Sequence, residues 1–286
     1  MAEFVRIHEV GPRDGLQNEK GVISVARKVA LIDLLSQSGL RDIEVGSFVS
    51  PKWVPQMADT DQVLAQLHPE PDVRYAVLVP NMRGWEGFLQ ARRADILTEI
   101  AVFIAASEGF SQSNLNCSIP ESVARLRPVV AAAQENGVVV RGYVSCVTDC
   151  PFDGAVAPQQ VADTVAMLRE VAPMQVSLGD TIGKGTPERV GAMLEAVLGA
   201  APATDLAGHF HDTGGQALAN IETSLDLGLR AFDSAVGGLG GCPYAPGAPG
   251  NVATEAVLAL LDRLGYETGI DRDVIAQAAE MARAMR

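Results

Sequence analysis

The chain has 286 residues, of which 48% are hydrophobic and 20% are charged, and its formal net charge is −13. This composition is ordinary for a globular protein with a sizeable core, and the length fits one large α/β domain or two small ones. The negative charge argues against a nucleic-acid groove and against a polybasic membrane anchor, so we expect neither nucleic acid nor a membrane as a partner.

Strand-like and helix-like segments alternate along the chain. Apolar runs of strand length and amphipathic runs of helix length follow one another eight times. The predicted strands are residues 4–10, 42–45, 73–79, 96–105, 138–144, 175–178, 205–211 and 231–236. The predicted helices are residues 24–38, 59–67, 85–91, 120–135, 158–171, 187–198, 216–227 and 252–264, with a last helix over 271–286.

Eight strand-then-helix units with short connections and apolar strands predict a parallel sheet covered by helices. Eight is the number that closes a (β/α)₈ barrel. The predicted fold is therefore α/β, a TIM barrel over residues 4–265 with a C-terminal helical extension over 266–286. An open doubly wound sheet is the alternative, but no glycine fingerprint of a dinucleotide site follows the first strand. No linker or low-complexity tract is evident, so we expect one domain over 1–286.

The lack of recognisable targeting signals and the cysteine usage lead us to expect a cytoplasmic protein. The N-terminal segment lacks the basic-then-apolar profile of a signal peptide. No apolar run approaches the ~18 residues that span a bilayer. The cysteines are too few and too scattered for a disulfide framework, so we expect reduced thiols at Cys117, Cys146, Cys150 and Cys242.

Residues able to carry chemistry gather at the C-terminal ends of the predicted strands, where the active site of such a barrel lies. They are Arg13, Asp14 and Gln17 after the first strand, Glu44 at the second, Tyr143, Ser145 and Cys146 at the fifth, Ser177 and Asp180 at the sixth, and His209 and His211 at the seventh. A glycine- and proline-rich stretch with Cys242 follows the eighth. The stability of the barrel alone does not require polar residues to gather at one rim.

His209 and His211 are two residues apart in a predicted strand, so both imidazoles project from one face. Asp14 is the natural carboxylate partner, because the first and seventh strands are close neighbours in a small closed barrel, and Asn251 can add an amide oxygen. These four ligands leave open positions on a six-coordinate ion such as Mg²⁺ or Mn²⁺. The alternatives are a satisfied histidine pair, a turn role for Asp14 and a helix N-cap role for Asn251.

Arg13 adjoins the candidate carboxylate ligand. A fixed cation beside a metal stabilises negative charge that develops on oxygen, as on the enolate of a thioester. The alternative is a salt bridge with Glu44 or Asp180, which is compatible with the catalytic role.

The stretch 237–250 is so rich in glycine, proline and small residues that we expect neither helix nor strand there. Its length favours a mobile functional loop. Cys242 at its centre can act as a general acid or base once water is excluded. An inert loop cysteine is the alternative.

Five segments match the motifs of a known family. They are residues 11–20 (GPRDGLQNEK), 47–57 (SFVSPKWVPQM), 141–146 (RGYVSC), 177–181 (SLGDT) and 240–245 (GGCPYA). Through them the chain resembles, from about residue 6 to 269, the 3-hydroxy-3-methylglutaryl-CoA lyase family of the metallolyase TIM barrels. Related synthases that condense acetyl-CoA with 2-oxo acids share the barrel and metal site but in general not the cysteine loop.

The resemblance implies a role for each matching residue. Asp14, His209, His211 and Asn251 match the metal ligands. The implied catalytic residues are Cys242, Arg13, Asp180 and Glu44, and the implied substrate-binding residues are Arg13, Gln17, Tyr143 and Ser177, with Glu255 also near the site. The implied reaction is retro-Claisen cleavage of (S)-3-hydroxy-3-methylglutaryl-CoA to acetyl-CoA and acetoacetate with Mg²⁺ or Mn²⁺, by an enzyme expected to be a homodimer.

Gly214 departs from the family pattern, which has tyrosine or another larger residue before Gly-Gln. A missing side chain beside the metal would widen the acyl pocket, so a lyase for a related acyl-CoA such as citramalyl-CoA is the first alternative. A Claisen-condensing synthase and a non-catalytic metal- or CoA-binding barrel are the others. The presence of both Arg13 and Cys242 counts against the non-catalytic barrel.

Overall fold

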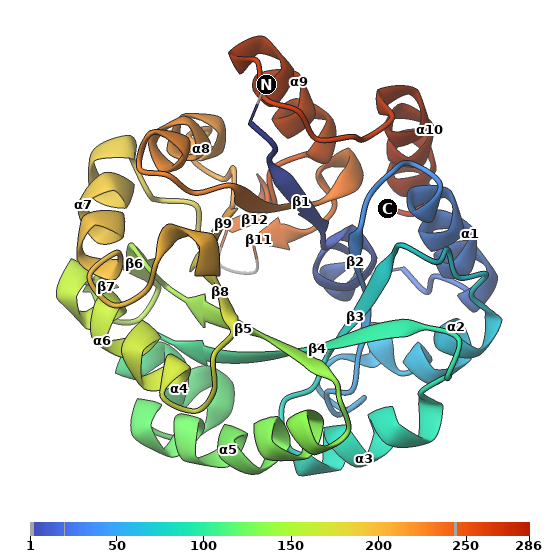
Figure 1. The fold of residues 1–286 in the computed structure, drawn as a ribbon, viewed down its shortest axis with the longest axis horizontal. Helices are drawn as coiled ribbons and strands as arrows, with labels where there is room; N and C mark the ends of the chain where they lie inside the picture. Colours follow the sequence, from blue (N-terminus) through green and yellow to red (C-terminus); the bar gives the residue numbers. More distant parts are fainter. Residues whose placement is uncertain (1–2, 20, 243–244) are drawn as a thin grey trace.

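Eight parallel strands close into a barrel, with the order β1-β10-β9-β8-β5-β4-β3-β2 around the ring (Figure 1). The computed structural model describes residues 3–19, 21–242 and 245–286, without the side chains of residues 97 and 241–249. The strands are β1 (Arg6–Glu9), β2 (Asp42–Ser47), β3 (Arg74–Leu78), β4 (Leu97–Ala105), β5 (Val139–Ser145), β8 (Gln175–Asp180), β9 (Leu206–Phe210) and β10 (Ala231–Ser234). The predicted TIM barrel is confirmed.

Helices surround the barrel on its outside (Figure 1). They are α1 (Val25–Ser36), α2 (Thr60–Gln66), α3 (Met82–Ala91), α4 (Glu108–Leu115), α5 (Ile119–Glu135), α6 (Pro158–Arg169), α7 (Pro187–Val197), α8 (Ala217–Asp226), α9 (Thr254–Leu264) and α10 (Arg272–Arg283). No helix in the described part of the chain is long and apolar enough to cross a membrane.

Local sequence explains where these helices start. Ser118 and Glu121 form a reciprocal capping box at the start of α5, where Pro120 occupies the first turn and needs no hydrogen-bond donor. Each of the predicted helices is present, with ends shifted by a few residues. The short α4 and the two-stranded hairpin of β6 (Asp149–Cys150) and β7 (Gly154–Ala155) were not predicted from the sequence.

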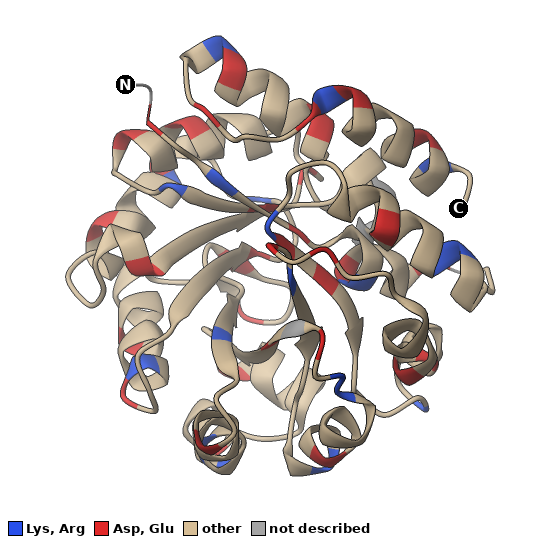
Figure 2. Ribbon diagram, turned by 45° about the vertical axis from the view of Figure 1, so that its right-hand side comes forward, with Lys and Arg blue, Asp and Glu red and all other residues tan. Residues whose placement is uncertain are grey.

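The interior of the barrel is crossed by polar contacts. Arg141 of β5 is paired with Asp233 of β10, although two strands separate β5 from β10 around the ring, so this ion pair spans the interior. Tyr143 of β5 reaches Glu44 of β2 in the same way. Figure 2 shows charged residues on the barrel strands as well as on the outer helices. The large apolar core therefore lies mainly between strands and helices.

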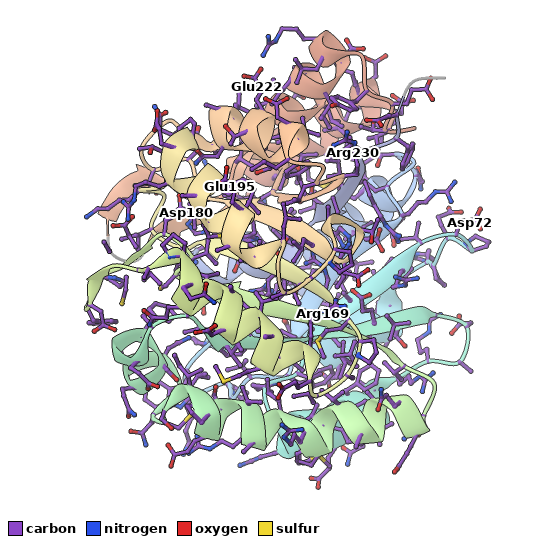
Figure 3. All side chains as sticks on the ribbon, turned by 60° about the vertical axis from the view of Figure 1, so that its left-hand side comes forward. Asp72, Arg169, Asp180, Glu195, Glu222 and Arg230 are labelled. Atoms are coloured by element: carbon purple, nitrogen blue, oxygen red, sulfur yellow. The ribbon has the colours of Figure 1, made fainter. Side chains whose placement is uncertain are left out.

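The two ends of the barrel differ in what they present. Figure 3 shows Asp180, the last residue of β8, on the opposite side from Asp72 and Arg230, which precede β3 and β10. The side of Asp180 is the C-terminal rim, where the candidate site was predicted.

The expectation of neither helix nor strand over 237–250 is wrong. A 3₁₀ turn η5 (Val236–Gly238) is followed by a small antiparallel hairpin of β11 (Gly241–Cys242) and β12 (Ala245–Pro249). A two-stranded hairpin tolerates proline and glycine because each strand has a free edge and needs few ladder hydrogen bonds. The turn η5 packs against α10: Gly237 has φ +66°, and a Cβ there would lie 3.1 Å from the carbonyl oxygen of Ala279.

Candidate metal centre

The turn that follows β1 places Arg13 and Asp14 at the rim. It is a single π-helical turn, η1 (Gly11–Gly15), in which three successive backbone N–H groups, from residues 13 to 15, donate to the carbonyl of Val10. Gly15 is needed for packing, because a Cβ there would lie 2.5 Å from the side chain of Leu239. The turn therefore lies directly against the segment that follows β10.

The histidine pair faces this turn. His209 lies in β9, and His211 directly after it forms a β-bridge with Asn251. The ligand-type atoms of Asp14, His209 and His211 all lie within 4.8 Å of one another. Nδ2 of Asn251 donates to Oδ2 of Asp14 at 2.8 Å, which leaves the amide oxygen of Asn251 available as a ligand. The structure thus brings the four predicted metal ligands together. The alternative of Asn251 as a helix N-cap is wrong, since the N-cap of α9 is Ala253.

The protonation states of Asp14 and His211 suit a cation. Burial raises the pKa of Asp14, but Arg13 and the two histidines outweigh it and bring the pKa down to about 2. Burial, reinforced by His209, lowers the pKa of His211 to about 4. At neutral pH the cluster offers a carboxylate and a neutral imidazole, the forms in which these groups bind metals. Nδ1 of His211 is also buried with no hydrogen-bond partner in the described part of the chain.

Arg13 connects the metal cluster to Glu44. Its Nη1 lies 2.7 Å from Oδ1 of Asp14 and its Nη2 lies 2.6 Å from Oε2 of Glu44. Its guanidinium lies 5.6 Å from the ring centre of Tyr143, whose hydroxyl donates to Glu44 at 3.2 Å. The predicted salt bridge of Arg13 is therefore made with Glu44.

The other predicted site residues differ in what they contact. Nε2 of Gln17 donates to Asp14 at 2.9 Å, so Gln17 belongs to the cluster. Ser177 is fully buried in β8 and donates to Asp233 at 2.8 Å. Of Cys242 the structure places the backbone in β11, and the side chain lies outside the described part.

Asp180 is engaged by the loop that follows its own strand. Its carboxylate accepts hydrogen bonds from the hydroxyl of Thr148 and from the backbone N–H groups of Lys184 and Gly185. It is fully buried. These contacts give Asp180 a role in shaping the loop 181–185, and they do not join it to the metal cluster.

Sequence reasoning missed three buried charged residues, Glu9, Arg141 and Asp233. Glu9 accepts hydrogen bonds from the N–H groups of Gly11 and Val236 and from the hydroxyl of Thr254, so it joins the segments after β1 and β10. Burial raises its pKa to about 7. For Arg141 and Asp233 the available signal was a charged residue inside an otherwise apolar strand, whereas the strand of Glu9 also contains Arg6 and His8.

Gly214 does not border open space. A Cβ at this position would lie 2.8 Å from the carbonyl oxygen of Gly183, to which the N–H of Gly214 donates at 3.1 Å. The backbone of the loop after β8 therefore occupies the place of the missing side chain. The prediction that Gly214 widens the acyl pocket is not supported by this packing.

Known proteins resemble this chain over nearly its whole length. Hydroxymethylglutaryl-CoA lyase of Pseudomonas mevalonii is 55% identical over 275 residues, which cover 96% of this chain and 90% of that protein. A 3-hydroxy-3-isohexenylglutaryl-CoA/hydroxymethylglutaryl-CoA lyase of Pseudomonas aeruginosa is 55% identical over 280 residues, covering 98% and 92%. The crystal structure of the HMG-CoA lyase from Brucella melitensis has a TM-score of 0.97 and 56% identity, covering 100% of this chain and 99% of that one.

These similarities confirm the predicted resemblance to the hydroxymethylglutaryl-CoA lyases. The model of the family described as HMGL-like matches residues 4–282. By fold and by sequence, this chain belongs to the HMGL-like family.

Proposed function

We propose that the chain is a divalent-metal-dependent lyase that cleaves 3-hydroxy-3-methylglutaryl-CoA to acetyl-CoA and acetoacetate. The observation that carries the proposal is the convergence of Asp14, His209, His211 and Asn251 at one rim of the barrel, with Arg13 beside them. The activity of relatives that are 55% identical supports the same reaction.

The four converging side chains would hold the cation. A carboxylate, two imidazoles and an amide oxygen suit Mg²⁺ or Mn²⁺, with Mn²⁺ the better match for the imidazoles. When bound, the cation would lower the pKa of the C3 hydroxyl of the substrate and stabilise charge on neighbouring oxygens.

The residues around the cluster supply the remaining chemistry of a retro-Claisen cleavage. A base of the cluster takes the proton of the C3 hydroxyl, the C2–C3 bond breaks, and its electron pair becomes the enolate of the acetyl thioester. We assign proton removal to this cluster rather than to Asp180, because the carboxylate of Asp180 is bound to Thr148 and to the loop 181–185 and is not joined to the cluster. Arg13 stabilises the enolate, and Cys242 returns a proton to C2.

Three further residues keep their proposed places near the substrate. Glu44 holds the guanidinium of Arg13 in place, and Tyr143 donates to Glu44 from across the barrel. Gln17 donates to Asp14 from the side of the turn, and we keep it as a proposed substrate-binding residue. We reassign Ser177 from substrate binding to the support of Asp233, since its hydroxyl is fully buried against that carboxylate.

A second acyl group has specific support. One relative with 55% identity carries a name that joins 3-hydroxy-3-isohexenylglutaryl-CoA to hydroxymethylglutaryl-CoA. By its name, a lyase 55% identical to this chain acts on a substrate with a longer C3 substituent. Citramalyl-CoA stays as an alternative substrate of the same chemistry.

The test is an assay of the purified protein after removal of metal with EDTA and supplementation with Mg²⁺ or Mn²⁺. The substrates are 3-hydroxy-3-methylglutaryl-CoA, its isohexenyl analogue and citramalyl-CoA, and the readout is acetyl-CoA by mass spectrometry. We expect cleavage of the first, dependent on added metal. Cleavage of none would remove the lyase proposal, and free CoA from acetyl-CoA plus 2-oxo acids would establish the synthase instead.

A cytoplasmic location and a homodimer are also proposed. The described cysteines Cys117, Cys146 and Cys150 are free thiols, which fits a reducing compartment. Light scattering coupled to gel filtration tests the dimer.

A further inference from the structure

A buried carboxylate lies directly behind His209. Asp233 stands beside His209 in the register of β10 against β9, and its Oδ2 lies 3.0 Å from Nδ1 of the imidazole. The side chain of Asp233 is 0% exposed, so water does not compete for this contact. On its other side Asp233 is paired with Arg141, which lies across the barrel interior.

Arg141 fixes the charge and orientation of this carboxylate. Its Nη2 donates to Oδ1 of Asp233 at 2.6 Å and its Nη1 to Oδ2 at 3.1 Å, while its Nε donates to Gln175. Ser177 adds a hydroxyl donor to Oδ2 at 2.8 Å. Both oxygens of Asp233 accept from the buried guanidinium of Arg141, which can only donate, so the ion pair holds Asp233 as a carboxylate that only accepts hydrogen bonds.

An acceptor-only partner decides which ring nitrogen of His209 carries the proton. Nδ1 must be the donor, and in the neutral imidazole Nε2 then keeps a free lone pair. We infer that Asp233, held by Arg141, is a positioning residue that fixes His209 in the Nδ1–H tautomer and presents Nε2 to the cluster with Asp14 and His211. Carboxylate–histidine contacts of this kind orient metal-binding imidazoles in other proteins.

The other histidine of the pair is held differently. Nδ1 of His211 has no hydrogen-bond partner in the described part of the chain, and its position comes from the backbone bridge with Asn251. Asp233 therefore acts on one member of the pair. The orientation and tautomer of the His209 ring should therefore depend on Asp233. Those of the His211 ring should not.

The substitution Asp233→Asn tests this with little change in shape. Asparagine has one side-chain oxygen, and the shorter bond of Arg141, 2.6 Å from Nη2, places that oxygen at Oδ1. The amide nitrogen then replaces Oδ2, so Nη1 of Arg141 loses its acceptor, and Nδ1 of His209 has to accept while its proton moves to Nε2. A similar aspartate-to-asparagine change in a serine-protease triad produces the wrong tautomer.

The tautomer can be read directly because the chain has four histidines. Long-range ¹H–¹⁵N spectra of metal-free, ¹⁵N-histidine-labelled protein are recorded at alkaline pH, and the signal lost in His209→Gln assigns His209. We expect Nδ1–H in the parent protein and Nε2–H in Asp233→Asn. His68, whose side chain is 85% exposed, is the internal reference.

Metal affinity is the second readout, and only this readout rests on the proposed metal centre. Titration of Mn²⁺ followed by electron paramagnetic resonance should show binding weakened roughly 10–100-fold in Asp233→Asn. Glu99→Gln is the matched control, because Glu99 is another buried carboxylate close enough to interact with Arg141 but has no bond to His209. It should change neither the tautomer of His209 nor the Mn²⁺ affinity.

The outcomes separate this inference from the proposed function. A proton on Nε2 of His209 in the parent protein overturns the inference about Asp233. This outcome does not depend on whether any variant folds. Unchanged tautomer or unchanged Mn²⁺ affinity in folded Asp233→Asn overturns it as well. A parent protein that binds no Mn²⁺ contradicts the proposed metal centre, while the tautomer still tests the role of Asp233.

Discussion

Nη2 of Arg13 lies 2.6 Å from Oε2 of Glu44, in an ion pair whose two side chains are 6% and 3% exposed. The other arm of the same guanidinium holds Asp14 at 2.7 Å. The planar guanidinium of arginine can hydrogen-bond two carboxylates at once, whereas the ammonium of lysine is a single point charge. The position of Arg13 is thus set by the protein before any substrate binds.

Arg13→Lys should therefore lower kcat for thioester cleavage by roughly 10²–10³-fold, as the loss of a fixed donor to a developing oxyanion does. The assay is acetyl-CoA formation at saturating substrate. Arg6→Lys is the control, because Arg6 makes a two-armed pair with Asp42 at the opposite end of the barrel. A variant Arg13→Lys with unchanged kcat and a raised KM would make Arg13 a ground-state binding residue.

Cys242→Ala should lower turnover by roughly 10²-fold or more, the contribution of a positioned proton donor. The affinity for Mn²⁺ should stay within about twofold of the parent value, since no proposed metal ligand is changed. Cys117→Ala, at a buried free thiol before α5, controls for the loss of a cysteine. Wild-type turnover in Cys242→Ala would show that the proton returns from another group.

The gathering of the candidate metal ligands was predictable because the barrel does most of the placement. Once eight parallel strands close a ring, residues that follow strand ends lie at one rim, so Asp14 and the histidine pair had to be close. Asn251 was harder, since it depends on the path of the chain after β10; its place just past the stretch 237–250 suggested it, and the family resemblance matched it. Element boundaries shifted by a few residues without moving any of these ligands across the barrel.

The contacts inside the barrel could not be predicted in the same way. Arg141 and Asp233 are 92 residues apart and meet across the interior, and no local spacing encodes that meeting. The packing of Gly214 against Gly183 likewise depends on two separate loops. Alternation in a strand gives the face on which a side chain lies, but not its partner on the far wall.

Gly214→Ala should destabilise the protein without changing which acyl-CoA is preferred. The added Cβ would lie 2.8 Å from the carbonyl oxygen of Gly183, and forcing atoms into packed structure costs about 1–3 kcal/mol. Urea unfolding measures this, and Gly21→Ala, where a Cβ meets nothing within 4 Å, is the control. A change of preference between the methyl and isohexenyl substrates would restore the interpretation that Gly214 sets the acyl pocket.

Glu99 should make the stability of the protein depend on pH. Burial raises its pKa from 4.5 to about 7, and Arg141 and Arg74 only partly oppose this shift. An acid whose folded pKa is raised stabilises the fold fully below its unfolded pKa, and this stability is lost as the pH rises through the folded pKa. The window therefore runs from pH 4.5 to about 7, and a pKa difference of about 2.5 corresponds to roughly 3 kcal/mol. Glu99→Gln cannot titrate, so relative to the parent its free energy of unfolding should rise by that amount between pH 4.5 and 8.

Urea unfolding of both proteins at these two pH values measures the difference, in which the shared titration of Glu9 and other groups cancels. An equal gap at both pH values would mean that Glu99 ionises in the folded protein with its ordinary pKa.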